Sequence, residues 1–202
     1  MFALSLALPI PVVQVPPPMV ALGDLSDEDL MSAYLTGDAA AFRVLFDRFG
    51  PRIQRMVRRH VPSDDDARDL VQQTFLQFHG ARADFRPGAM LRPWLLTIAM
   101  NLLRERWRRQ KRRPTVELDE LTLESDASTS EPLERRRERA RAIAAVAQLP
   151  ESQREVIELH WFQELPFSEV ADIVGANEGA VRVRAHRAYE RLKILLAEEV
   201  RS

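Results

Sequence analysis

Cysteine is absent from this 202-residue sequence, which excludes a disulfide scaffold, a thiolate metal site and a cysteine nucleophile. Histidine is scarce, and the four residues are not paired at a spacing typical of the ligands of one metal ion. They are His60, His79, His160 and His186. A zinc enzyme is therefore not indicated, and we expect no metal, no cofactor and no catalytic residues.

Charged residues are missing from the first 23 positions, which hold five of the 13 prolines. A signal peptide needs a basic start and an unbroken apolar segment, and neither is present here. The three consecutive prolines at positions 16–18 also prevent the long apolar helix of a membrane span. We expect residues 1–23 to be a disordered extension of a cytoplasmic protein, with no membrane insertion.

Net charge is small as well, because 29 basic and 30 acidic residues sum to −1, and this at first argues against a nucleic-acid partner. This sum combines two regions of opposite net charge. Residues 114–134 hold seven acidic residues and no basic one, so the rest of the chain carries +6. The positive charge is concentrated at residues 101–113 and 178–193, which makes these two segments candidate surfaces for nucleic acid.

Strand-like alternation of useful length is absent, and helix signals follow one another along the chain. The first three helices begin with typical capping residues: Ser26, Asp38 and Ser63. Gly50-Pro51 predicts a break or a kink in the second of them. A loop with short turns is predicted for residues 80–93, and a strong helix from Trp94 to about Arg113.

The segment 114–134 has the acidic, serine-containing composition of a flexible linker. Helices resume after it, and the first of them has an apolar face formed by Leu133, Ala140, Ile143 and Ala147. Three more are predicted over residues 151–163, 167–174 and 178–197. We therefore expect an all-α protein of two small helical domains, 24–113 and 135–202, joined by an acidic tether.

The last two predicted helices form a helix-turn-helix, because Gly175 ends the first and Asn177 can cap the second. The second helix has an apolar side that is expected to face the core: Val181, Ala185, Ala188 and Leu192. Its opposite side presents Arg182, Val183, His186, Arg187 and Glu190. Arginine suits guanine edges or phosphates in a major groove, and an outward valine suits a thymine methyl. The alternative is a solvated basic face on an ordinary helix.

A second candidate surface lies on the helix that starts at Trp94. Apolar residues cover most of its circumference and leave a narrow polar stripe of Thr97, Asn101, Arg104 and Arg108, with Trp94 at its edge. Such a stripe suits single-stranded or groove-bound DNA, because bases stack on aromatic rings while arginines hold phosphates. The alternative is that Trp94 belongs to the core and that the arginines only keep the helix soluble.

The helix over residues 66–79 carries a candidate docking patch. Its predicted buried face is formed by Ala67, Val71, Phe75 and Phe78. Leu76 lies in the middle of the other face, surrounded by Asp69, Gln72 and Gln73. An exposed leucine in a polar ring is compatible with a protein-binding site, although single exposed leucines are common.

Together these segments resemble the extracytoplasmic-function group of bacterial RNA polymerase sigma factors. Residues 66–76 (DARDLVQQTFL) resemble region 2.2 of that family, and residues 94–101 (WLLTIAMN) resemble regions 2.3 and 2.4. Leu149-Pro150 and the later segment 179–188 (GAVRVRAHRA) resemble region 4. The match covers about residues 26–113 and 135–197, which is nearly everything except the extension and the linker.

The resemblance implies a promoter-specificity subunit and not an enzyme. In the first domain it implies docking on the beta-prime clamp helices of core RNA polymerase through Asp69, Gln72, Gln73 and Leu76. It implies that the −10 element is melted and held by Trp94, Thr97, Asn101, Arg104 and Arg108. The loop from about Ala83 to Met90 would help to form the pocket for a flipped base.

In the second domain, the resemblance implies contacts with the −35 element through Arg182, Val183, His186 and Arg187, and binding to the polymerase beta flap. It also implies an anti-sigma factor as a further partner. The linker 114–134 would lie near the RNA exit path, where we hypothesise that its negative charge mimics RNA.

Three other functions remain open. A self-sufficient helix-turn-helix regulator would bind duplex DNA alone, but it would leave the polar stripe on the Trp94 helix unexplained. A nuclease would need a carboxylate cluster in a pocket, and the acidic residues 64–66 are explained by their place at a helix start. A helical adaptor without a DNA role would not need an arginine stripe on a buried helix.

Overall fold

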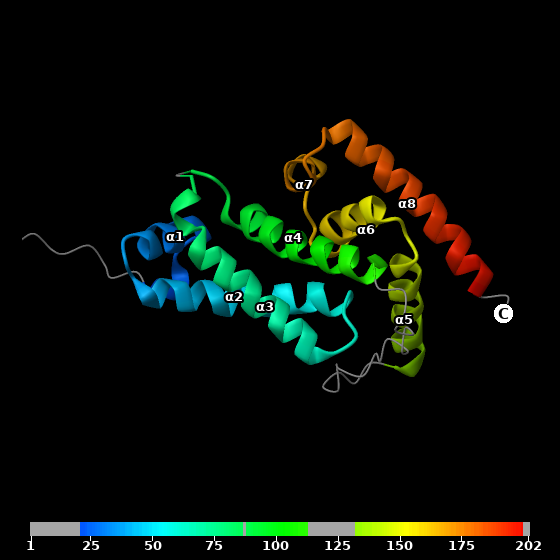
Figure 1. Ribbon diagram of the computed structural model, residues 1–202, viewed down its shortest axis with the longest axis horizontal. Helices are drawn as coiled ribbons and strands as arrows, with labels where there is room; N and C mark the ends of the chain where they lie inside the picture. Colours follow the sequence, from blue (N-terminus) through cyan, green and yellow to red (C-terminus); the bar gives the residue numbers. More distant parts are fainter. Residues whose placement is uncertain (1–20, 87, 113–131, 200–202) are drawn as a thin grey trace, which may run out of the picture.

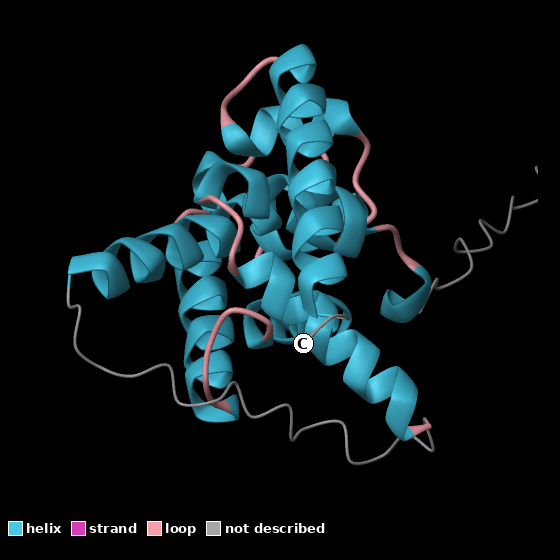
Figure 2. Cartoon of the chain, turned by 90° about the vertical axis from the view of Figure 1, so that its right-hand side faces the viewer, coloured by secondary structure: helices cyan, strands magenta, loops and turns pink. Residues whose placement is uncertain are grey.

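The computed structural model describes residues 21–86, 88–112 and 132–199, and every regular element in these ranges is helical (Figures 1 and 2). This confirms the all-α prediction. The first unit contains the turns η1 (Leu22–Asp24) and η2 (Arg82–Asp84) and the helices α1 (Asp27–Leu35), α2 (Ala39–Arg58), α3 (Asp64–Gly80) and α4 (Leu91–Arg112). The second contains α5 (Leu133–Ala147), α6 (Glu151–Ile157), η3 (Glu158–Phe162), α7 (Phe167–Val174) and α8 (Glu178–Glu199).

The predicted helix starts are confirmed by their capping hydrogen bonds. The Ser26 hydroxyl accepts the Asp29 N–H at 3.0 Å, and the Ser63 hydroxyl accepts the Asp66 N–H at 3.1 Å. The Asp38 carboxylate accepts the N–H of Ala40 at 2.8 Å. Each cap satisfies a backbone donor that the first turn of a helix leaves unpaired.

Two predicted details of the first unit are decided by the structure. Of the predicted break or kink at Gly50-Pro51, the break is excluded: α2 continues through Pro51, because Phe49 and Ile53 on either side are both buried and hold the two halves against one core. The helix α4 begins at Leu91 and not at Trp94. Leu91 is fully buried, and its N–H donates to the Glu28 carboxylate at 3.2 Å, so a distant side chain supplies the partner for the first turn.

Leu22 and Gly23 were assigned to the predicted disordered extension, but they belong to the folded first unit. Leu22–Asp24 form the turn η1, Leu22 packs against the core, and the Gly23 carbonyl accepts a hydrogen bond from Arg48 at 2.6 Å. Residues 1–20 of the extension lie outside the described residues, as do residues 113–131 of the predicted linker. The end of that linker is helical, because α5 starts at Leu133.

The face predicted for α5 is partly correct, because Ala140, Ile143 and Ala147 are partly buried. Leu133 is 62% exposed, whereas Ala145 and Val146 are the buried residues of this helix. Val146 forms a small cluster with Leu149, Ile157 and Ala188. Only the end of α5 approaches α6 and α8 (Figure 1), so burial is decided where the helices cross and not by the apolar periodicity of the whole helix.

The two units share a continuous hydrophobic core. The cluster built on α1 to α4 extends into the second unit through Val156, Leu159, Leu165, Val170 and Val181. The helices α4 and α7 lie against each other at the centre of this contact. None of the described helices combines the length and the apolar character needed to cross a membrane.

Phe78→Ala is expected to lower the free energy of unfolding by about 3–5 kcal/mol. The ring is fully buried and contacts four other aromatic rings: Tyr34, Phe42, Phe75 and Trp94. Leu76→Ala on the same helix is the matched control, and it should change the stability by less than about 0.5 kcal/mol because Leu76 is exposed. Urea denaturation followed by circular dichroism measures both, and equal losses would contradict the assigned core.

Candidate nucleic-acid interface

The helix-turn-helix is formed by α7, a tight turn and α8. Gly175 ends α7 with φ +64° and ψ 43°, a left-handed conformation that glycine adopts without a Cβ penalty. The Asn177 side chain then accepts the N–H of Ala180 at 2.7 Å and caps α8. The turn and the cap together set the angle at which α8 is presented.

The two sides of α8 are those predicted from the sequence. Val181, Ala185 and Ala188 are buried, and the opposite side is exposed at every predicted position: Arg182, Val183, His186, Arg187 and Glu190. Val183 is 49% exposed, although nothing on its own helix requires an apolar residue there. This side therefore combines positive charge with one apolar contact, as a reader of base edges does.

The guanidinium of Arg182 is held in place by two neighbours. It donates to the Glu178 carboxylate at 2.5 Å and 3.0 Å, and it lies 4.8 Å from the centroid of the Phe167 ring. Phe167 in turn stacks on His160 with centroids 3.9 Å apart. Sequence reasoning missed Phe167, because no spacing along the chain links the start of α7 to Arg182.

The polar stripe predicted on α4 is formed, and its residues make hydrogen bonds with one another and with the backbone of α4. Asn101 is exposed and accepts a hydrogen bond from Arg104 at 2.8 Å. Thr97 donates to the Pro93 carbonyl at 2.8 Å, and the Arg108 Nε donates to the Arg104 carbonyl at 3.3 Å. The four predicted polar residues thus follow one another along a single helix.

Trp94 is half-buried, and its ring lies 5.5 Å from Phe78 and 5.2 Å from Phe85, centroid to centroid. The structure therefore places this ring against the aromatic core, at the edge of the stripe and not on it. The loop beside it contains η2, a buried Phe85, Gly88 at φ +78° and an exposed Met90.

The patch predicted around Leu76 is exposed. Leu76 is 62% exposed, and Asp69, Gln72 and Gln73 on the same side of α3 are exposed as well. Phe46 of α2 is a further exposed apolar residue in this unit, and its ring lies 4.6 Å from that of Phe75. Helical periodicity alone does not show that Phe46 remains uncovered.

Charged residues from both units meet between them. Arg104 donates to both oxygens of Glu155, at 2.7 Å and 3.1 Å, and both side chains are largely buried. Glu158 is fully buried and accepts hydrogen bonds from Arg59, one of them 3.1 Å long, and from the ring of His60 at 3.0 Å. No sequence motif signals these pairs, because their members lie about 50 to 100 positions apart.

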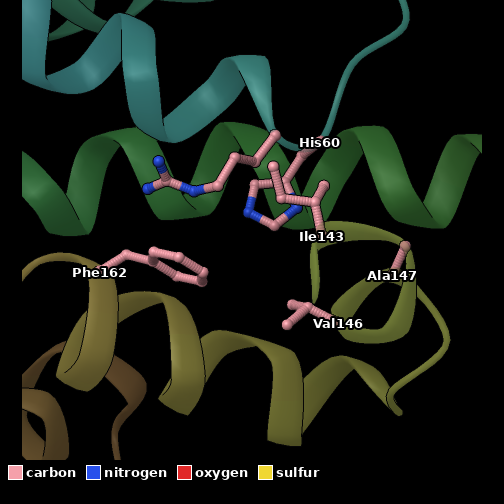
Figure 3. Close-up of a pocket in the computed structure, with 6 residues that line it drawn as sticks. His60, Ile143, Val146, Ala147 and Phe162 are labelled. Carbon is pink, nitrogen blue, oxygen red and sulfur yellow. The ribbon is translucent and has the colours of Figure 1, made fainter. Parts of the chain in front are cut away.

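Burial alone would raise the pKa of Glu158, but the hydrogen bonds and charges of His60 and Arg59 outweigh it and hold this pKa at about 2. Apolar side chains line a small pocket beside Arg59 and His60. In Figure 3 the His60 ring lies opposite Ile143 and Val146 of α5, and Phe162 lies beside it. The Arg59 guanidinium is 4.3 Å from the centroid of the Phe162 ring.

Two family models match the chain: Sigma-70 region 2 over residues 45–113 and Sigma-70 region 4 over residues 139–192. The chain is 35% identical over 176 residues to the RNA polymerase sigma factor CarQ of Myxococcus xanthus, covering 83% of this chain and 96% of CarQ. It is 32% identical over 183 residues to the ECF RNA polymerase sigma factor SigM of Mycobacterium tuberculosis, covering 89% and 90% of the two chains.

Two solved structures are similar along most of the chain. The structure of CnrH in complex with the cytosolic domain of CnrY matches with a TM-score of 0.67 and 27% identity, over 85% of this chain and 97% of that one. The sigma factor RpoE in complex with the anti-sigma factor NepR from Bartonella quintana matches with a TM-score of 0.62 and 26% identity, over 77% and 96%.

Glu158→Gln is expected to remove a pH-dependent part of the stability. A carboxyl whose pKa is lower in the folded state stabilises the fold above its ordinary pKa of 4.5, and this contribution is lost as the pH falls towards about 2. The difference in unfolding free energy between the unchanged chain and this variant should therefore shrink by about 3 kcal/mol between pH 6 and pH 2.

Urea denaturation at a series of pH values measures that difference. Asp172→Asn is the matched control, because Asp172 is an exposed carboxylate of the same unit. If the two variants show the same pH dependence, the buried ion pair does not carry the effect.

Proposed function

The chain belongs to the extracytoplasmic-function sigma factors of RNA polymerase, and we propose that its helix α8 reads the −35 element while α4 opens and holds the −10 element. The chain directs core polymerase to promoters, as members of this family do. The observation that carries the proposal is that one chain presents two chemically different polar surfaces. One is the exposed side of α8 with two arginines, a histidine and a valine, and the other is the polar stripe on the largely buried helix α4.

The −35 contacts are assigned to Arg182, Val183, His186 and Arg187. All four are exposed on one side of α8. A helix of this kind fits the major groove, where arginine bonds guanine and valine contacts thymine methyls. Glu178 and Phe167 position Arg182, so that little side-chain freedom is lost when it binds.

The −10 contacts are assigned to Thr97, Asn101, Arg104 and Arg108, with Trp94 supporting the adjoining loop from about Ala83 to Met90. Flipping a base out of the duplex costs a few kcal/mol, which contacts in a protein pocket must offset. The exposed Asn101 amide has both a donor and an acceptor for a base edge. Arginines along the same helix would hold the backbone of the separated strand.

The polymerase contacts are assigned to Asp69, Gln72, Gln73 and Leu76 for the beta-prime clamp helices, and to the second unit for the beta flap. Segments 24–113 and 135–202 would act as two binding units, and segment 114–134 would connect them. The protein would work in the cytoplasm with polymerase and an anti-sigma factor, as a specificity subunit that performs no chemistry of its own.

Transcription in vitro with core polymerase, with and without this chain, tests the proposal when it is combined with permanganate footprinting of unpaired thymines. Promoter-specific transcripts and reactive −10 thymines should both require the chain. Strong specific binding of duplex DNA by the chain alone, with no melting when core is added, would favour the helix-turn-helix regulator and contradict the proposal.

Arg187→Ala is expected to weaken −35 recognition by about 1–3 kcal/mol, because a bidentate contact to guanine is lost. Competition between promoters that differ at one −35 position measures this loss as a change in preference. Lys193→Ala is the matched control, since it removes the same charge from another exposed position of α8. An equal change of preference in both variants would remove Arg187 from base readout.

Leu76→Asp is expected to weaken binding to core polymerase at least tenfold, because a charge replaces an apolar anchor at the centre of the patch. Leu35→Asp is the matched control, because Leu35 is also an exposed leucine of this unit but lies on α1. Fluorescence anisotropy with core polymerase measures both affinities. Binding of Leu76→Asp at the unchanged strength would contradict the docking assignment.

A further inference from the structure

Two residues at the start of α8 form an exposed ion pair beside the proposed −35 surface. Glu178 is the first residue of α8, and Arg182 follows it one helical turn later. Both side chains are exposed to water. Because an exposed ion pair at this spacing adds little to the stability of a helix, stability alone does not explain its geometry.

The hydrogen bonds within the ion pair use only part of each charged group. Nε and Nη2 of Arg182 both donate to the same oxygen of Glu178, Oε1, at 3.0 Å and 2.5 Å. The other carboxylate oxygen, Oε2, accepts no hydrogen bond from the described part of the chain. The guanidinium has further N–H groups on Nη1 and Nη2. The ion pair can therefore bind a second partner through both residues and keep the bonds that it already has.

The plane of the guanidinium is fixed as well. Cζ of Arg182 lies over the ring of Phe167, 4.8 Å from its centroid. Phe167 stacks on His160, and Nδ1 of His160 is 2.7 Å from the Leu165 carbonyl oxygen, so the ring below the guanidinium is itself held. A guanidinium covered on its face by an aromatic ring presents its edge, where its N–H groups lie.

The free groups of the ion pair match the major-groove edge of one kind of base pair. A G·C base pair presents two acceptors there, N7 and O6 of guanine, and beside them one donor, the N4 amino group of cytosine. The ion pair offers N–H donors on Arg182 and, beside them, the Oε2 acceptor of Glu178. An A·T base pair presents an acceptor, a donor and an acceptor, so its amino group would face an N–H of the arginine.

Contact with the DNA backbone does not suit Glu178, because a carboxylate repels phosphates. The N-terminal residues of a recognition helix are those that reach base edges. The residue after Glu178 is the exposed Gly179, which has no side chain to keep the start of α8 away from the bases. A carboxylate at this place is compatible with DNA when a neighbouring arginine offsets its charge and a base amino group donates to it.

We propose that Glu178 is a base-reading residue, which acts together with Arg182 to select one G·C base pair of the −35 element. Arg182 donates to guanine, and Oε2 of Glu178 accepts a hydrogen bond from the N4 amino group of the cytosine paired with that guanine. This inference rests on the proposed role of α8 in reading duplex DNA, and it adds Glu178 to the residues assigned to that surface.

Selection from a promoter library randomised across the −35 element, bound by the chain assembled with core polymerase and then sequenced, tests the proposal. Arg182→Ala and Glu178→Ala should each lower the preference for G·C at the same single position about tenfold and leave other positions unchanged. Glu178→Asp should lower it too, because its carboxylate is one methylene shorter, although the negative charge at the helix start is kept. Glu190→Ala, which removes another exposed carboxylate of α8, is the matched control and should change no preference.

Two results of the selection would overturn the proposal. In one, Glu178→Ala keeps the G·C preference at the position where Arg182→Ala loses it. In the other, Glu178→Ala strengthens binding to all sequences equally, which means that the carboxylate only repels phosphates. The proposed function fails separately: if Arg182→Ala and Arg187→Ala both leave every −35 preference unchanged, α8 does not read this element, whatever Glu178 does.

A base analogue separates a direct contact of Glu178 from an effect transmitted through Arg182. Pyrimidin-2-one in place of the selected cytosine lacks the N4 amino group and leaves the paired guanine unchanged. Anisotropy of a labelled promoter should show that the analogue weakens binding about fivefold for the unchanged chain and for Glu190→Ala, each assembled with core polymerase. It should have little further effect on Glu178→Ala. An equal loss with all three proteins would show that Glu178 acts only through Arg182 and would overturn the proposal.

Discussion

The carboxylate of Glu158 is the group on which the relative placement of the two units depends. It has no access to water, and burial of an unpaired charge is so costly that the carboxylate must keep its partners. Arg59 and His60 supply them from the end of α2, and Gln163 supplies a third from the segment after η3. Since the chain continues from η3 into α7 and α8, this contact also affects how α8 is oriented against the first unit.

The two proposed DNA surfaces differ in how they are kept available. The side of α8 that carries Arg187 is exposed, and the opposite side is buried through Val181, Ala185 and Ala188. In the proposed function, duplex DNA would approach the exposed side without a rearrangement of the helices. The stripe on α4 is enclosed by the second unit at Arg104.

Much of the fold was predictable because it depends on short-range chemistry. Capping residues such as Ser26 and Ser63 act within one helical turn, and the buried faces of α3 and α8 follow from the helical period. The errors have distant causes. Leu91 starts α4 because Glu28, from another helix, accepts its N–H, and α5 buries Val146 because of where that helix crosses its neighbours. Local periodicity carries no information on either point.

The sequence by itself determined the all-α class, the faces of the candidate DNA helices and the exposed leucine of α3, because each is a property of residues close together on one helix. The tertiary structure alone decided that Arg104 meets Glu155, that Phe167 holds Arg182, and that the core is continuous across the two units. These pairs join different helices, so they exist only once the chain has folded. The strength of these contacts depends on how deeply their side chains are buried, and a local stretch of sequence does not specify this.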